Sequence, residues 1–497
     1  MCITINMKKI LLILLSFTFI FSFGGCTKKE NLQELGKNLT TYNMNISLDC
    51  NSKSASVEQT INYVNNSNSI LKQIKFHLYP QFFEEGGSEY IVPITKMNDA
   101  YPNGISYGDF NISRVKVDNI EQSPKYDGVM DSVLVVDLNN SLLPNESEEI
   151  YIQYTIILPN CHHRFGYGES TINLANFYPI TCVYEDNKFN TSEYHSNGDP
   201  FYSDMANYTV NISTNKQYIV ASTGEKISEK IIEGKKKIEF KAYMVRDFAM
   251  VLSDKFQVLS QKLEDVNIDY FYLNDSSPAV SLSAGLDAIK TFSKLFGYYP
   301  YTNYSIVQCD FIHGGMEYPN LVMISNEITN KDDYINVIIH ETAHQWWYGL
   351  VGNDEFTYPW LDEALTEFST TLFYDYNKNY TLTHTQIIKS SKENYTLFVT
   401  VYEDVLGSLD TSMRAVNEYF TEPEYTYCTY VKGTLMFESL YQLIGEKQFL
   451  KSLQTYFNDN KYKNSTPKDL ISAFEKTTQQ SFSNFFNCWI KGKVIIR

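Results

Sequence analysis

The sequence HETAH at residues 340–344 constrains this chain more than any other stretch. Two histidines stand four residues apart, with a glutamate directly after the first. Residues i and i+4 share one face of an α-helix, so His340 and His344 can direct both imidazoles at one cation. Glu341 projects to the side, where it can hold a water molecule on that cation. The spacing therefore predicts a helix built around a metal site.

A third ligand for this site is available further along the chain. Glu363 lies in the sequence WLDEA at residues 360–364. Two histidines, one carboxylate and an open fourth position are the ligand set of catalytic zinc sites, so the sequence predicts one Zn²⁺ ion. The structural alternative is a buried helix whose histidines bond to neighbouring backbone groups. Residues 334–347 are apolar on most faces, and burying polar side chains among them needs a compensating partner, for which a metal is the best candidate.

Other polar residues are weaker candidates for the site. Glu367 follows Glu363 by one helical turn and could compete as a ligand, and Asp362 could support a ligand or cap the helix. The pair His162 and His163 favours a loop over a second metal site. His313 could line a cleft, but no motif includes it.

The N-terminus has the features of a targeting segment. Lys8 and Lys9 precede an apolar run over residues 10–23, which is too short to span a bilayer comfortably. The run ends in FGGC, typical of a bacterial lipobox, so we expect residues 1–25 to be a lipoprotein signal peptide and Cys26 to carry lipid. An ordinary secretory signal is the alternative. A lipid anchor would place the protein on the extracytoplasmic face of a bacterial cell membrane, with residues 26–38 as a tether.

Charge and cysteine content exclude some functions. The formal net charge of −17 argues against nucleic acid or anionic lipid head groups as partners. The cysteines are scattered, and none has the spacing of metal ligands. Cys161 and Cys182 are close enough in sequence to form a disulfide, and the sequence leaves this open.

The chain is long enough for more than one domain, and its pattern changes along its length. Short alternating or apolar runs between Asn, Gly, Pro and Ser clusters predict a β-domain over residues 39–262. Helical spacing begins after about residue 275, so residues 263–497 are expected to be mostly helical. The predicted fold class is α+β.

Four motifs in order carry a resemblance to a known family. They are GGMEYPN at residues 314–320, HETAH, Glu363, and YVKG at residues 430–433. Together they resemble the gluzincin aminopeptidases, the family of membrane alanyl aminopeptidase and the leukotriene hydrolases. The resemblance implies an antiparallel β-sandwich or saddle-shaped domain followed by a thermolysin-like peptidase domain. It also implies a small bacterial lipoprotein member that lacks the C-terminal helical domain of larger relatives.

The resemblance also implies roles for individual residues. His340, His344 and Glu363 would bind zinc, Glu341 would deprotonate the attacking water, and Tyr430 would donate to the oxyanion. The other motif residues would bind the substrate: Glu317 its free α-amine, and Gly314, Gly315 and Met316 its backbone.

Tyr318 stands where the family motif has asparagine, and no residue of the β-domain matches the family's amine-binding glutamine. The leading hypothesis is a zinc aminopeptidase acting on peptides with a free N-terminus. The alternatives are a zinc metallopeptidase without a strict free-amine requirement, and a catalytically dead surface-binding lipoprotein.

Overall fold

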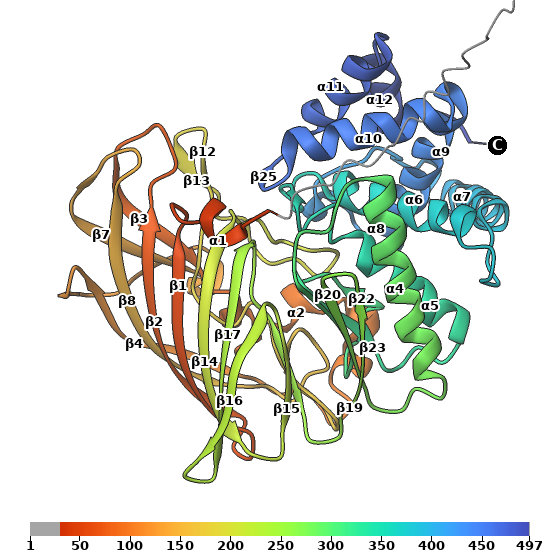
Figure 1. Ribbon diagram of the computed structural model, residues 1–497. Helices are drawn as coiled ribbons and strands as arrows, with labels where there is room; N and C mark the ends of the chain where they lie inside the picture. The colour runs from red at the N-terminus through yellow and green to blue at the C-terminus, as the bar shows by residue number, and fades with distance from the viewer. Residues whose placement is uncertain (1–29, 497) are drawn as a thin grey trace, which may run out of the picture.

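A computed structural model describes residues 30–496, and the chain forms two halves that lie side by side (Figure 1). Strands dominate the first half and helices the second, which confirms the predicted α+β class. Cys26 and the predicted signal peptide lie outside the described residues. Within residues 30–496, no helix combines the length and hydropathy needed to cross a bilayer.

An eight-stranded sheet forms the body of the β half. Its buried and exposed residues alternate along β1 (Thr41–Asp49), as expected for a sheet with one face on the core and one in water. The pairing is antiparallel except between β1 and β14 (Ala206–Asn215), which run parallel. In spatial order the strands are β16 (Glu225–Ile232), β17 (Lys235–Val245), β14, β1, β2 (Ser54–Val64), β8 (Ser147–Ile157), β4 (Asp109–Val117) and β5 (Ile120–Gln122).

Two four-stranded sheets complete the β half. The first consists of β15 (Ile219–Ser222), β18 (Met250–Ser253), β10 (Ile172–Leu174) and β9 (Phe165–Tyr167). The second consists of β11 (Ile180–Thr181), β3 (Leu71–His77), β7 (Val133–Leu142) and β6 (Lys125–Asp127). Short helical turns follow β3, among them α2 (Ser88–Ile91) and the 3₁₀ turn Ile94–Lys96.

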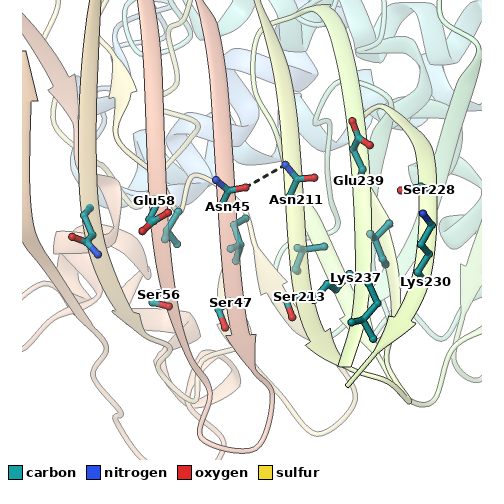
Figure 2. Close-up of a pocket in the computed structure, with 16 residues that line it drawn as sticks. Asn45, Ser47, Ser56, Glu58, Asn211, Ser213, Ser228, Lys230, Lys237 and Glu239 are labelled. Atoms are coloured by element: carbon teal, nitrogen blue, oxygen red, sulfur yellow. Dashed lines mark hydrogen bonds between the residues drawn. The ribbon is translucent and has the colours of Figure 1, made fainter. Parts of the chain in front are cut away.

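The outer face of the large sheet carries a shallow groove (Figure 2). Its side chains are isoleucines and a valine together with amides, hydroxyls and charges such as Asn45, Ser47, Asn211 and Lys237, and none of the sixteen residues that line it is a histidine or cysteine. The groove therefore lacks the donor types predicted for the metal site.

The helical half begins with a five-stranded sheet, and the predicted boundary at residues 262 and 263 falls within its first strand. In order the strands are β19 (Gln257–Leu263), β20 (Val266–Tyr272), β21 (Asn303–Cys309), β23 (Leu321–Ser325) and β22 (Gly315–Met316). The helices are α4 (Pro278–Leu295), α5 (Lys331–Ala343), α6 (Pro359–Tyr376), α7 (His384–Leu406), α8 (Glu422–Thr426), α9 (Lys432–Ile444), α10 (Glu446–Asn460), α11 (Pro467–Thr478) and α12 (Ser483–Ile490).

Arg246 joins the two halves. Its guanidinium is buried, and it donates hydrogen bonds to the carbonyls of Ser203 at 2.9 Å, Tyr348 at 2.8 Å and Lys463 at 2.5 Å. A buried guanidinium needs such acceptors because an unpaired charge inside a protein is costly. This contact fixes the β half against the turn that follows α5.

Of the tether predicted over residues 26–38, the structure describes residues 30–38 only. From residue 30 the described part is docked on the fold. Residues Leu32–Leu35 form helix α1, the side chain of Asn207 donates to the carbonyl of Gly36 at 2.7 Å, and Tyr462 donates to Glu30 at 2.5 Å. The polar composition of this segment gave no indication of these specific partners. Cys161 and Cys182 are both free thiols.

Candidate metal centre and substrate cleft

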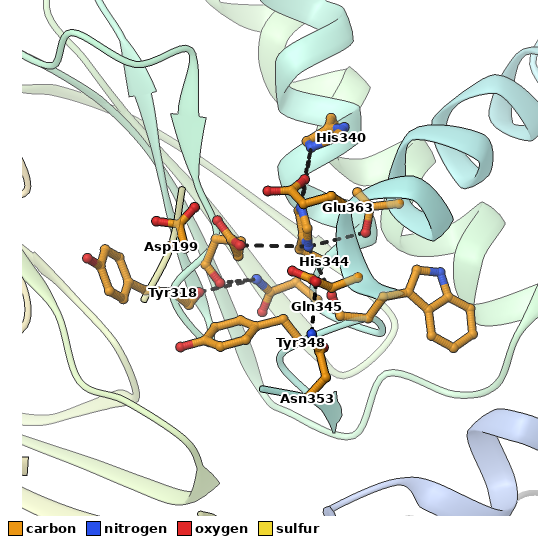
Figure 3. Close-up of polar contacts among 12 residues, drawn as sticks. Asp199, Tyr318, His340, His344, Gln345, Tyr348, Asn353 and Glu363 are labelled. Atoms are coloured by element: carbon orange, nitrogen blue, oxygen red, sulfur yellow. Dashed lines mark hydrogen bonds and ion pairs between the residues drawn. The ribbon is translucent and has the colours of Figure 1, made fainter. Parts of the chain in front are cut away.

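Helices α5 and α6 bring the three predicted metal ligands together (Figure 3). His340 Nε2 lies 3.2 Å from His344 Nε2, and Glu363 Oε2 lies 3.2 Å from His344 Nε2 and 3.4 Å from His340 Nε2. Four tetrahedral ligands about 2.05 Å from a zinc ion lie roughly 3.3 Å apart. The three atoms therefore have the mutual spacing of a zinc site.

The hydrogen bonds on the outer side of the two histidines determine which ring nitrogen of each is unprotonated and faces the metal centre. His340 Nδ1 lies 2.8 Å from Glu367 Oε2, and His344 Nδ1 lies 2.9 Å from the carbonyl of Trp347. Both partners are acceptors, so each Nδ1 carries a proton and each Nε2 presents a lone pair. Three lone pairs that converge this closely repel one another unless a cation lies between them. The donor set thus fits Zn²⁺, and Glu367 orients a ligand instead of competing with it.

Both ends of helix α5 have defined caps. The side chain of Asn330, not Asp332 or Asp333, caps the helix by accepting from the backbone N–H groups of both aspartates. At the other end, the helix stops at Ala343, so His344 lies in the C-cap position and not inside a longer helix.

Glu341 points to the side of the ligand pair and packs against strand β22. A Cβ atom at Gly315 would lie 2.3 Å from Glu341 Oε1, so only glycine leaves room for this carboxylate. A Cβ at Gly314 would meet nothing closer than 3.7 Å, so that glycine is not needed for the same reason. Burial raises the pKa of Glu341 to about 7, which suits a group that exchanges protons near neutral pH.

Glu317 lies on the same wall, beyond Met316, and is buried; its Oε1 atom has no hydrogen-bond partner and lies 3.8 Å from His344 Nδ1. Burial raises its pKa well above the usual range. Gln345 holds this loop in place, because its Nε2 donates to the carbonyl of Tyr318 at 3.2 Å and its Oε1 accepts from the backbone N–H of Asn320 at 2.9 Å. The residue after HETAH thereby connects the metal helix to GGMEYPN.

Tyr318 anchors this loop to the β half. Its hydroxyl donates to Asn176 Oδ1 at 2.5 Å, and Asn176 donates in turn to Asp247 Oδ2 at 2.6 Å. Tyr178 donates to the other oxygen of Asp247 at 2.8 Å. The tyrosine in place of the family asparagine thus links the Glu317 loop to a buried hydrogen-bond network.

The β half adds an acidic residue that the sequence analysis missed. Asp199 has a carboxylate oxygen within 4.8 Å of oxygens of Glu317 and Glu363. Arg164 holds it through Nη2, 2.7 Å from Asp199 Oδ1, while Tyr194 accepts from Arg164 Nη1 at 2.9 Å. No local spacing marks this pair, because 35 positions of chain separate the two residues. Figure 3 shows Asp199 on the opposite side of the ligands from α6.

Tyr430 approaches the centre from the other wall. Its hydroxyl donates to Glu363 Oε1 at 2.5 Å, and its ring stacks beside His340 with centroids 6.3 Å apart. It belongs to a π-helical turn over Tyr427–Val431, a local irregularity that often marks functional sites. Of the neighbouring tyrosines, Tyr425 also lines the cleft, but Tyr430 is the one bonded to Glu363.

The remaining candidates lie around the centre. Asp362 accepts from Asn353 Nδ2 at 2.9 Å, and burial raises its pKa to about 8. His163 Nε2 lies 3.2 Å from His313 Nε2, and both line the cleft, whereas His162 lies 3.6 Å from Glu327. In the part of the chain that is described, none of these three histidines belongs to a set of three close ligand atoms.

Comparison with known proteins found a similar family model and similar folds. Residues 280–489 match the model of the peptidase family M1 domain. A crystal structure of an M1 zinc metallopeptidase from Deinococcus radiodurans superposes with a TM-score of 0.64 at 14% sequence identity, over 93% of this chain and 96% of that chain. The helical half therefore has the fold of an M1-type catalytic domain.

Curated relatives match part of this chain at low identity. Aminopeptidase M1 of Arabidopsis thaliana is 25% identical over 225 residues, which is 43% of this chain and 25% of the plant protein. Aminopeptidase B of Rattus norvegicus is 28% identical over 221 residues, or 41% of this chain and 33% of the rat protein. The matched regions therefore span about a quarter to a third of these relatives.

Proposed function

We propose that this chain is a zinc-dependent aminopeptidase that removes N-terminal residues from peptides. One observation carries the proposal: three convergent metal-ligand atoms lie in a buried cleft beside two further carboxylates, Glu317 and Asp199. A peptide fits this arrangement with its first carbonyl at the metal and its ammonium group at the two carboxylates. Aminopeptidases among the M1-type relatives support the same activity.

The residues of the chain divide the chemistry among them. A bound Zn²⁺ supplies Lewis-acid polarisation of the carbonyl and lowers the pKa of a coordinated water. Glu341 accepts the proton of the attacking water and delivers it to the leaving amine. Tyr430, already aimed at Glu363, can turn its hydroxyl to the carbonyl oxygen as that oxygen gains negative charge. Glu317 and Asp199 hold the ammonium group and so fix which bond is cut.

Zinc content and hydrolysis of alanine p-nitroanilide by the full chain test this function. We expect about one zinc ion per chain, loss of hydrolysis on removal of the metal with a chelator, and recovery when zinc is added back. An undiminished rate in metal-free protein would contradict the proposal.

We also propose that the protein is held at a bacterial cell membrane on the extracytoplasmic face, through lipid on Cys26. The support is the FGGC sequence after a basic and apolar leader. Mass spectrometry of the N-terminal peptide tests it: a diacylglycerol-modified Cys26 is expected, and an unmodified cysteine in a membrane-free protein would contradict it.

A further inference from the structure

The substrate cleft has two chemically different ends. Glu317 and Asp199 make one end acidic. The wall of the cleft then runs along residues 313–317, past Gly315 opposite Glu341, to His313. His313 lies two residues before Gly315, and residues 312–314 form a bend, so the two residues are at most about 7 Å apart. A peptide held by its amine at the acidic end would therefore extend its leaving portion toward His313.

The turns that follow strand β3 lie at the His313 end of the cleft. His163 lies next to His313, and its Nε2 is 3.1 Å from the carbonyl of Ile91, the last residue of α2. Lys96 follows five positions later and lines the same cleft. The β half thus walls the cleft where the leaving portion would emerge.

Residues 419–426, here termed the roof segment, cross from the helical half to meet this wall. Glu422 Oε1 lies 2.7 Å from Lys96 Nζ, and Thr95 donates to Glu422 Oε2 at 3.3 Å. Toward the acidic end, Asn197 donates to the carbonyl of Tyr419 at 3.3 Å. The roof segment is therefore fastened to the β half at two places along the cleft.

We propose that the bridge between Lys96 and Glu422 sets the length of the substrate. This inference rests on the proposed function and adds a substrate class to it. A span of at most about 7 Å between Gly315 and His313 holds no more than about two extended residues beyond the cleaved bond. Di- and tripeptides bind with the bridge closed, whereas a longer peptide has to break it.

The bridge between Lys96 and Glu422 is weak enough to disfavour long peptides without excluding them. The Lys96 and Glu422 side chains are 31% and 29% exposed. Ion pairs at partly exposed positions contribute modestly to stability, so one bridge of this kind disfavours long substrates by roughly three- to fivefold. Ile94 and Phe420, each two positions from a member of the bridge, are 90% and 91% exposed, so little of either side chain is packed against the protein.

The test compares hydrolysis of trialanine and hexa-alanine, with each variant's rate normalised to its own rate on alanine p-nitroanilide. In wild type we expect kcat/KM for hexa-alanine to be roughly three- to fivefold below that for trialanine. Lys96→Gln and Glu422→Gln should each remove this difference, and the charge-reversed double variant Lys96→Glu with Glu422→Lys should restore it. Lys125→Gln, which breaks an exposed ion pair with Asp137 outside the cleft, is the matched control and should keep the wild-type ratio.

The outcomes separate the two proposals. A hexa-alanine to trialanine ratio that is the same in wild type and in both single variants would overturn the length limit while leaving the aminopeptidase function intact. Failure of the double variant to restore the ratio would also overturn it. Absence of any anilide hydrolysis in wild type would instead contradict the proposed function.

Discussion

The two halves of the molecule meet in one cleft but contribute to it differently. The helical half supplies His340, Glu341, His344 and Glu363 from one short stretch. The β half supplies Asp199 through Arg164, from separate loops. Under the proposed function, the bond-breaking groups are encoded in local spacing. Part of the recognition of the substrate's end, the part assigned to Asp199, depends on contacts formed only when the halves pack together.

If the helical half holds the chemistry, Glu341→Gln should have the largest effect. The amide cannot accept a proton, so we expect kcat on alanine p-nitroanilide to fall about 10³-fold. The three ligand atoms are untouched, so zinc content measured by atomic absorption should stay near one ion per chain. An unchanged rate would remove Glu341 from the mechanism.

If the β half recognises the substrate's end, Asp199→Asn should have the next largest effect. Losing one charge beside the ammonium group should lower kcat/KM for alanine p-nitroanilide roughly 30-fold, with most of the loss in KM. Asp137→Asn, a change on the exposed outside of the same half, is the control and should leave kcat/KM unchanged. Equal kinetics in the two variants would confine recognition to the helical half.

The contact of Glu367 with His340 tests whether residues beyond HETAH and Glu363 support the metal site. Glu367→Gln weakens the acceptor that holds His340 Nδ1–H, so the Kd for zinc should rise roughly tenfold, with a smaller effect on kcat at saturating zinc. Competition with a chromophoric chelator measures this Kd. A loss of activity that added zinc does not restore would contradict a role limited to orienting the ligand.

The smallest expected effect concerns stability away from the cleft. His384 at the start of α7 contacts Asp375 Oδ2 at 2.5 Å and Glu438 Oε2 at 2.8 Å. Burial lowers the pKa of His384, but the hydrogen bonds and charges of Glu438 and Asp375 outweigh burial and raise the pKa above its ordinary value.

A raised pKa in the fold gives stability that is fully present below the unfolded pKa and is lost as the pH rises through the folded pKa. The unfolded value is about 6.5. His384→Gln should therefore lower Tm by about 2 °C at pH 6 and by less at pH 9. Thermal unfolding followed by circular dichroism measures both, and equal losses at the two pH values would contradict this account.

The sequence predicts well what depends on short spacing. HETAH and Glu363 alone predict a ligand set whose nitrogen and oxygen atoms the structure places within 3.4 Å of one another. Strand alternation and helical periodicity predict the α+β class, which the structure confirms. These predictions succeed because each pattern depends on the geometry of a single helix or a single strand.

Long-range partners could not be predicted in the same way. Asp199 forms an ion pair with Arg164 at the cleft, and Tyr318 finds its acceptor on Asn176 in the other half. The docking of residues 30–38 could not be predicted for a similar reason, since residue 30 gains its partners from residues 461 and 462. The local sequence around these polar side chains carries no motif, and their roles are defined by tertiary contacts.

The most direct test of the central claim compares alanine p-nitroanilide with its N-acetyl form. If Glu317 and Asp199 hold a free ammonium group beside the metal centre, acetylation removes the charge and adds bulk where these carboxylates lie. We predict that wild type prefers the free-amine substrate by about 100-fold or more in kcat/KM, as the loss of about 3 kcal/mol of charged hydrogen bonding requires. Equal kcat/KM for the two substrates would contradict an aminopeptidase and leave a metallopeptidase that does not require a free amine.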